Sequence, residues 1–127
     1  MKNSKFYVCA HCGNLVELIR DAHVPMFCCG QAMDELIPGS QEASHEKHIP
    51  AVEVREDRVE VNVGSVDHPM VDVHWIEWVQ LVTDKGSYRV WLNPGQAPHV
   101  SFPIHEEKPL EVYAYCNIHG LWKTELN

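Results

Sequence analysis

The stretch LEVYAYCNIHG at residues 110–120 combines an alternating strand pattern with a pair of candidate metal ligands. Residue character alternates over the first part of this stretch, which is the period of a β-strand. One face of that strand is expected to hold Leu110, Val112, Ala114 and Cys116. Cys116 and His119 are then separated by two residues and followed by Gly120, a spacing typical of chelating turns. The stretch therefore predicts a β-strand that ends in a metal-binding turn.

The strand period recurs along most of the chain upstream of this stretch. Valines alternate with polar residues at positions 52–63, on either side of a turn at residues 56–58. Further strands are expected at residues 71–83, 88–92 and 100–104. Pro103 makes the last of these an edge strand, because proline cannot donate a hydrogen bond to a neighbouring strand. Short strands without a long helical segment indicate a mainly β fold, an antiparallel β-sandwich of the immunoglobulin-like type.

Length, composition and charge restrict the class of protein. The chain has 127 residues, of which 45% are hydrophobic and 22% charged, as in soluble globular proteins. No apolar run reaches the roughly 18 residues of a membrane helix, and no apolar signal core follows Met1. We therefore expect a cytoplasmic protein with no membrane partner. The net charge of −8 disfavours nucleic acid as a partner, and an anionic substrate would need a local positive site.

The first part of the chain differs from the rest in its cysteine content. Residues 1–37 hold four of the five cysteines and too few apolar residues to fold without a further source of stability. We expect a small metal-stabilised domain there, a polar linker at residues 38–46 and the β-sandwich at residues 47–127. An odd number of cysteines in a reducing compartment favours metal ligation over a disulfide framework.

Four of the cysteines form the first candidate metal site. Cys9 and Cys12 make a C-x-x-C pair, and Cys28 and Cys29 follow as an adjacent pair. Four thiolates predict tetrahedral zinc or iron, with equal support for each metal, and the adjacent pair predicts a distorted geometry. A disulfide between Cys28 and Cys29 is the strained alternative. His11 is expected to be an exposed neighbour, because four thiolates already complete such a site.

The second candidate site gathers histidines around the chelating turn. His48, His68 and His74 lie near expected strand ends, and together with Cys116 and His119 they offer five donors to one ion. Structural zinc takes four ligands, so a fifth donor favours a reactive centre. We expect the remaining histidines to be surface residues: His23, His45, His99 and His105.

The two ligand sets differ in net charge and in whether they leave a coordination position of the metal free. Four imidazoles in a plane with an axial thiolate leave one position free, and a thiolate pushes electron density towards it. This arrangement suits the binding and reduction of a small oxygen species. Ferrous iron with four thiolates is anionic, whereas ferrous iron with four neutral imidazoles and one thiolate is cationic and attracts an anion. The N-terminal site is therefore expected to serve structure or electron storage.

These residues resemble desulfoferrodoxin, the two-iron class of superoxide reductase, over essentially the whole chain. Beside the four N-terminal cysteines, the resemblance rests on EKHIP at residues 46–50, GSVDHPM at 64–70, HWIEW at 74–78, PGQAP at 94–98 and YCNIHGLWK at 115–123. It implies a desulforedoxin-like N-terminal domain with an Fe(Cys)4 site, which favours iron over zinc there. It also implies a β-sandwich that holds Fe(His)4(Cys) with Cys116 axial.

The resemblance further implies an activity and its partners. Superoxide would be reduced to hydrogen peroxide without release of dioxygen, with a rubredoxin-like protein as electron donor and a homodimer as the assembly. Glu46 and Lys47 match a pair to which the family assigns roles in turnover. Glu46 would occupy the sixth position of ferric iron at rest, and Lys47 would attract superoxide and assist protonation. From the residues alone, this pair also fits a solvated surface.

Two other functions fit the same ligand patterns. A pure electron carrier would use both metals for transfer only and would not bind external anions. A zinc-stabilised interaction module would be colourless.

Overall fold

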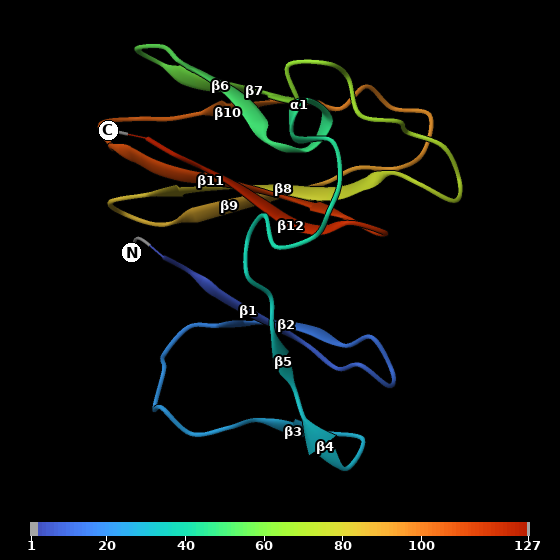
Figure 1. Cartoon of the computed structure of the whole chain (residues 1–127). Helices are drawn as coiled ribbons and strands as arrows, with labels where there is room; N and C mark the ends of the chain where they lie inside the picture. Colours follow the sequence, from blue (N-terminus) through green and yellow to red (C-terminus); the bar gives the residue numbers. More distant parts are fainter. Residues whose placement is uncertain (1–2, 127) are drawn as a thin grey trace. The chain divides into compact units, whose positions relative to one another are not determined.

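The computed structural model describes residues 3–126, which form two compact units, shown in Figure 1. The smaller unit is Asn3–Ile37, and the larger unit begins at Pro38. Each unit has its own sheets and its own cluster of metal-binding residue types.

Two antiparallel sheets build the larger unit. One has the order β10-β7-β6 and the other the order β12-β11-β8-β9. The strands are β6 (Pro50–Val54), β7 (Arg58–Val63), β8 (Ile76–Thr83), β9 (Ser87–Trp91), β10 (His99–Pro103), β11 (Pro109–Cys116) and β12 (Gly120–Glu125). This arrangement confirms the predicted antiparallel β-sandwich, and it confirms that the strand containing Pro103 lies at a sheet edge.

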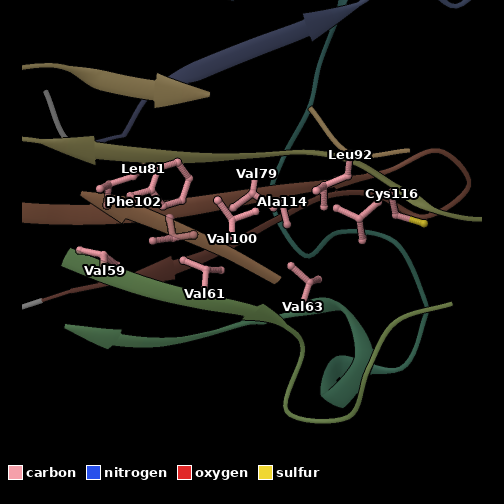
Figure 2. Close-up of a cluster of buried hydrophobic side chains, with 12 residues drawn as sticks. Val59, Val61, Val63, Val79, Leu81, Leu92, Val100, Phe102, Ala114 and Cys116 are labelled. Carbon is pink, nitrogen blue, oxygen red and sulfur yellow. The ribbon is translucent and has the colours of Figure 1, made fainter. Parts of the chain in front are cut away.

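The core between the sheets follows the alternation of the sequence. Strand β7 buries every second residue, and Val59, Val61 and Val63 are each 0% exposed. Each fully buried valine stabilises the fold by roughly 1.5–3 kcal/mol relative to an exposed one. Figure 2 shows these side chains packed among residues of the other sheet, with the sulfur of Cys116 at one end of the cluster. The core therefore fixes the side chain of a predicted metal ligand.

The predicted strand over residues 71–83 is wrong in its first part, because β8 begins only at Ile76. Val71 and His74 instead exchange two backbone hydrogen bonds of 3.0 Å and close a tight turn. Val71 and Val73 are 54% and 76% exposed, so their β-branched side chains form no buried face. The β-branched composition favours a strand here, but no neighbouring strand within residues 3–126 pairs with this segment. The turn places His74 ahead of the sheet rather than within it.

The smaller unit has little core of its own. Strands β1 (Lys5–Val8), β2 (Leu15–Leu18) and β5 (Asp34–Glu35) form a sheet of order β2-β1-β5, and β3 (Phe27–Cys28) pairs with β4 (Gln31–Ala32). Among its described residues only Phe6 and Cys9 are buried. So few buried side chains support the expectation that a bound metal contributes much of this unit's stability.

The one helix found in residues 3–126 is α1 (His45–His48), which is far too short to cross a membrane. Its backbone lies directly against Gly64, in the loop after β7. A Cβ atom added at Gly64 would lie 2.5 Å from the carbonyl oxygen of Glu46 and 2.8 Å from that of Ile49. The same loop donates a hydrogen bond of 2.9 Å from Val66 N to the Glu46 oxygen. Close backbone packing therefore fixes α1 to the sandwich.

This contact predicts that Gly64→Ala destabilises the larger unit. The obstructing atoms belong to the backbone and cannot rotate away, so α1 must shift, and the free energy of unfolding should fall by about 1–3 kcal/mol. Gly86→Ala is the matched control, because a Cβ there meets nothing within 4 Å. It should change stability by less than about 0.5 kcal/mol. Denaturant unfolding of both variants measures the difference, and equal stabilities would contradict the packing described.

Candidate metal centres

The first centre lies in the smaller unit, where the four predicted cysteines come together. The sulfur atoms of Cys9, Cys12, Cys28 and Cys29 all lie within 4.8 Å of one another. All cysteines are free, and the Cys28 and Cys29 sulfurs are 4.0 Å apart, about twice the length of a disulfide bond. The alternative of a vicinal disulfide is therefore wrong. His11 is exposed and lies outside the group, as predicted.

Two turns with left-handed residues present these sulfurs. Gly13, with φ of 84°, closes the first turn by donating its N–H to the Cys9 carbonyl oxygen at 2.9 Å. Cys29 and Gly30 have φ of 54° and 76° in the turn between β3 and β4, a conformation that suits glycine and costs energy at Cys29. Backbone N–H groups of Cys12 and Asn14 point at sulfurs, at 3.4 and 3.5 Å. Such donors stabilise thiolates.

The geometry and ionisation of the four thiols fit a tetrahedral ion. Metal–sulfur bonds of about 2.3 Å imply sulfur–sulfur edges of about 3.8 Å, and the Cys12–Cys28 and Cys28–Cys29 separations are 3.6 and 4.0 Å. The Cys12 N–H lowers the pKa of Cys9 to about 6, whereas hydrogen bonding with the Cys12 thiol raises the pKa of Cys29 to about 12. Four crowded thiols cannot all ionise without a cation among them.

The second centre lies in the larger unit and contains all five predicted donors. Ligand atoms of His48, His68, His74 and Cys116 lie within 4.8 Å of one another. His119 joins them, with Nδ1 3.2 Å from His48 Nε2 and 3.9 Å from Cys116 Sγ. Residues separated by more than 70 positions in the sequence are thus brought to one point.

Different elements supply these five side chains. His48 ends α1, His68 follows β7, and His74 lies in the turn before β8. Cys116 ends β11, and His119 lies in the turn to β12. The cysteine therefore comes from a strand whose position the core fixes, while the histidines come from the helix, loops and turns beside it.

Backbone carbonyls determine which ring nitrogens face the centre. His48 Nδ1 lies 2.7 Å from Ser44 O, and His68 Nδ1 lies 2.6 Å from Pro69 O. A carbonyl oxygen can only accept, so Nδ1 donates in both rings and Nε2 of the neutral ring carries a lone pair. These two Nε2 atoms face each other at 3.1 Å. Two lone pairs at this distance repel unless a cation lies between them.

Burial keeps the imidazoles in the form that binds metals. It lowers the pKa of His68 to about 4 and also lowers the pKa values of His48 and His74, so these rings are neutral at pH 7. His74 Nε2 is buried and has no hydrogen-bond partner. Burial raises the pKa of Cys116, although the His119 N–H at 3.4 Å opposes this. A metal ion would give these nitrogen lone pairs a partner and would favour the thiolate form of Cys116.

Other histidines and a tryptophan complete the surroundings. The four histidines expected at the surface are exposed: His23, His45, His99 and His105. Trp122, which lies in the motif at residues 115–123 but had no expected role, packs against the His48 ring with centroids 4.9 Å apart. Its Nε1 also donates to the His119 carbonyl oxygen at 3.0 Å. The sequence signal for Trp122 is its place in that motif, three residues after His119.

The Glu46–Lys47 pair lies on α1, immediately before His48. Glu46 is exposed and Lys47 is half-buried, and neither side chain belongs to the converging ligand atoms. Within residues 3–126, no carboxylate lies at ion-pair distance from the Lys47 ammonium group. Its charge is therefore not neutralised by a neighbouring side chain.

Known proteins resemble this chain in sequence over most of its length. A family model described as Desulfoferrodoxin matches residues 40–125. The desulfoferrodoxin of Nitratidesulfovibrio vulgaris is 43% identical over 121 residues, 95% of this chain and 95% of that protein. A superoxide reductase of Thermococcus kodakarensis is 33% identical over 99 residues, 64% of this chain and 86% of that protein.

Solved structures agree with the sequence comparisons. The crystal structure of the superoxide reductase from Treponema pallidum superposes with a TM-score of 0.80 at 35% identity, covering 98% of this chain and 100% of that chain. A one-iron superoxide reductase from Giardia intestinalis covers 65% of this chain at 26% identity, with a TM-score of 0.53. With two convergent ligand clusters, a β-sandwich and relatives of matching length, the chain belongs to the desulfoferrodoxin family.

Proposed function

We propose that this protein is a superoxide reductase, which reduces superoxide by one electron to hydrogen peroxide and releases no dioxygen. The observation that carries the proposal is the convergence of four imidazoles and one thiol, with lone pairs directed at one point. Bound ferrous iron supplies the chemistry there, because it can give one electron to superoxide while two protons complete hydrogen peroxide.

The chain's own residues determine how that iron is held. His48, His68 and His74 present Nε2, His119 presents Nδ1, and Cys116 presents Sγ. Five donors are one more than structural zinc takes and one fewer than an octahedral ion accepts. The set therefore leaves a place for an external ligand, which distinguishes a reactive centre from a structural one.

Local charge then favours an anionic substrate. Imidazoles bind a metal in their neutral form, so four of them and one thiolate would leave a divalent ion with net positive charge, in a chain whose net charge is −8. Lys47 lies next to His48 on α1 and forms no ion pair with a described carboxylate, so its ammonium group adds to the attraction and can supply a proton. Glu46, the exposed carboxylate beside it, is the proposed sixth ligand of the oxidised resting state.

The smaller unit is proposed to hold a second iron. Cys9, Cys12, Cys28 and Cys29 form an anionic set when ionised, which repels superoxide and suits electron storage or structural stabilisation. We propose the division into a desulforedoxin-like domain at residues 1–37, a linker at 38–46 and a superoxide reductase domain at 47–127. The first boundary is supported by the division of the chain into compact units, which falls between Ile37 and Pro38.

The family relationship supports the remaining parts of the proposal. A rubredoxin-like protein is the proposed electron donor, and a homodimer is the proposed assembly. The cytoplasm is the proposed location, because free thiols such as the five in this chain persist in a reducing compartment.

Replacing Cys116 with Ser tests the proposed function most simply. Loss of the thiolate should remove the visible thiolate-to-iron charge-transfer band and lower superoxide reduction by at least about 100-fold, since even outer-shell changes cost 10–100-fold. The visible spectrum of the Fe(Cys)4 site in the same molecules is the internal control for iron loading. A variant that keeps both the band and the turnover would refute the assignment of Cys116.

Lys47→Ile tests the electrostatic part of the proposal. The second-order rate constant for superoxide, measured by pulse radiolysis, should fall by about tenfold and depend less on ionic strength. Lys108→Ile makes the same change in net charge at an exposed position outside the site, and its rate should match that of the unaltered protein. Equal rates in the two variants would remove Lys47 from the mechanism.

A further inference from the structure

His74 differs from His48 and His68 in how its ring is held. His48 and His68 each donate Nδ1 to a backbone carbonyl oxygen, and this bond fixes both tautomer and ring orientation. Within the described residues, the structure gives the His74 imidazole no such bond, and its Nε2 is buried without a partner. Its ring contacts the imidazoles of His68 and His119, with centroids 4.6 and 5.2 Å apart, but no hydrogen bond from the described residues orients it, so its position depends strongly on its own backbone.

That backbone has little support from the larger unit's core. The turn that holds His74 closes on itself through the two bonds between Val71 and His74. The neighbouring side chain of Val73 is 76% exposed. A short, exposed turn of this kind opens easily unless it is tied to a more stable element.

Asn117 makes the missing connection, through three hydrogen bonds to the residues on either side of His74. Its Nδ2 donates to Val73 O at 3.0 Å, and its Oδ1 accepts from Trp75 N at 2.9 Å. Its own backbone N–H donates to Trp75 O at 3.2 Å. The side chain thus grips the peptide groups immediately before and after the histidine.

Asn117 connects the His74 turn to a better-fixed part of the second centre. It lies between Cys116 and His119, in the turn that provides the thiol and one imidazole. Cys116 is 0% exposed in the core, so the turn is well fixed. The amide therefore ties the exposed His74 turn to the part of the centre that the sandwich itself holds.

The two hydrogen bonds from the Asn117 side chain to Val73 O and Trp75 N, called the clamp below, require an amide. It needs one donor for a carbonyl oxygen and one acceptor for an N–H group, both on a short side chain. Asparagine provides both, aspartate only accepts when ionised, and alanine does neither. Neither aspartate nor alanine at position 117 could form both side-chain hydrogen bonds.

We propose that Asn117 is a positioning residue, which fixes the His74 ring against the Cys116–His119 turn and so sets how tightly the second centre holds its metal. This inference rests on the proposed function, since it takes His74 to be a ligand. Removing outer-shell partners of metal ligands typically lowers metal affinity by 10–100-fold. The same loss is expected for Asn117→Ala.

The test is a double-mutant cycle on the full-length protein, with Co²⁺ alone as the probe. Affinity of the second centre is measured by chelator competition, and the four-cysteine centre of the same molecules serves as the internal reference. Asn117→Ala should weaken Co²⁺ binding by about 10–100-fold and alter the cobalt absorption spectrum. In a His74→Ala background the same substitution should have no further effect, because the clamp acts only through that ring.

Two further variants separate positioning from a general loss of structure. Asn93→Ala removes an exposed asparagine from the loop after β9 and should leave Co²⁺ affinity unchanged. Asn117→Asp keeps the acceptor for Trp75 N–H, so exchange of this amide with solvent should stay slow, whereas Asn117→Ala should accelerate it. These exchange rates are measured by NMR on the metal-free protein.

The outcomes discriminate between the inference and the function on which it rests. An unchanged affinity in Asn117→Ala, or an equal loss in the presence and absence of His74, would overturn the clamp and leave the superoxide reductase assignment standing. An unchanged affinity in His74→Ala alone would overturn the ligand assignment, and the clamp with it.

Discussion

Two carbonyl oxygens, of Ser44 and Pro69, impose the constraint on which the second centre depends. By accepting from Nδ1 of His48 and His68, they turn two Nε2 lone pairs towards each other at 3.1 Å inside the protein. Burial lowers the pKa of both rings, so protons do not readily relieve the repulsion. Only a cation between the rings does so at neutral pH. The fold is thus arranged around a charge that the chain itself does not contain, and metal binding and local order are coupled.

The β-sandwich positions the cysteine of this centre, and the segments beside the sandwich position the histidines. The buried core positions Cys116 at the end of β11, where its sulfur is as well fixed as any core side chain. Gly64 allows α1 to approach the sandwich closely enough to bring His48 to the same point. The remaining histidines lie in a loop and in turns, which depend on hydrogen bonds for their position. A strand held by the core places the thiol, and hydrogen-bonded loops and turns place the imidazoles, so the site is held precisely.

Much of this arrangement can be predicted from the sequence, for reasons that particular residues make clear. Alternating valines and the Cys116–His119 spacing are local patterns, so they reveal the strands and the chelating turn directly. The five donors and the exposed histidines follow from the motifs, and family resemblance adds iron. The irregular backbone before Ile76 was missed, because β-branched residues favour a strand whether or not anything packs on them. The ring nitrogens that face the centre and the roles of Asn117 and Trp122 depend on distances between remote segments, which no local pattern encodes.

The central claim is that five side chains of the larger unit hold one iron. A crystal structure of the reduced, iron-loaded protein, with anomalous data collected at the iron absorption edge, tests it most directly. The account predicts an anomalous peak within bonding distance of Nε2 of His48, His68 and His74, Nδ1 of His119 and Sγ of Cys116, with no sixth protein ligand. An iron bound without one of these imidazoles, or closed off by a protein side chain in the ferrous state, would contradict it.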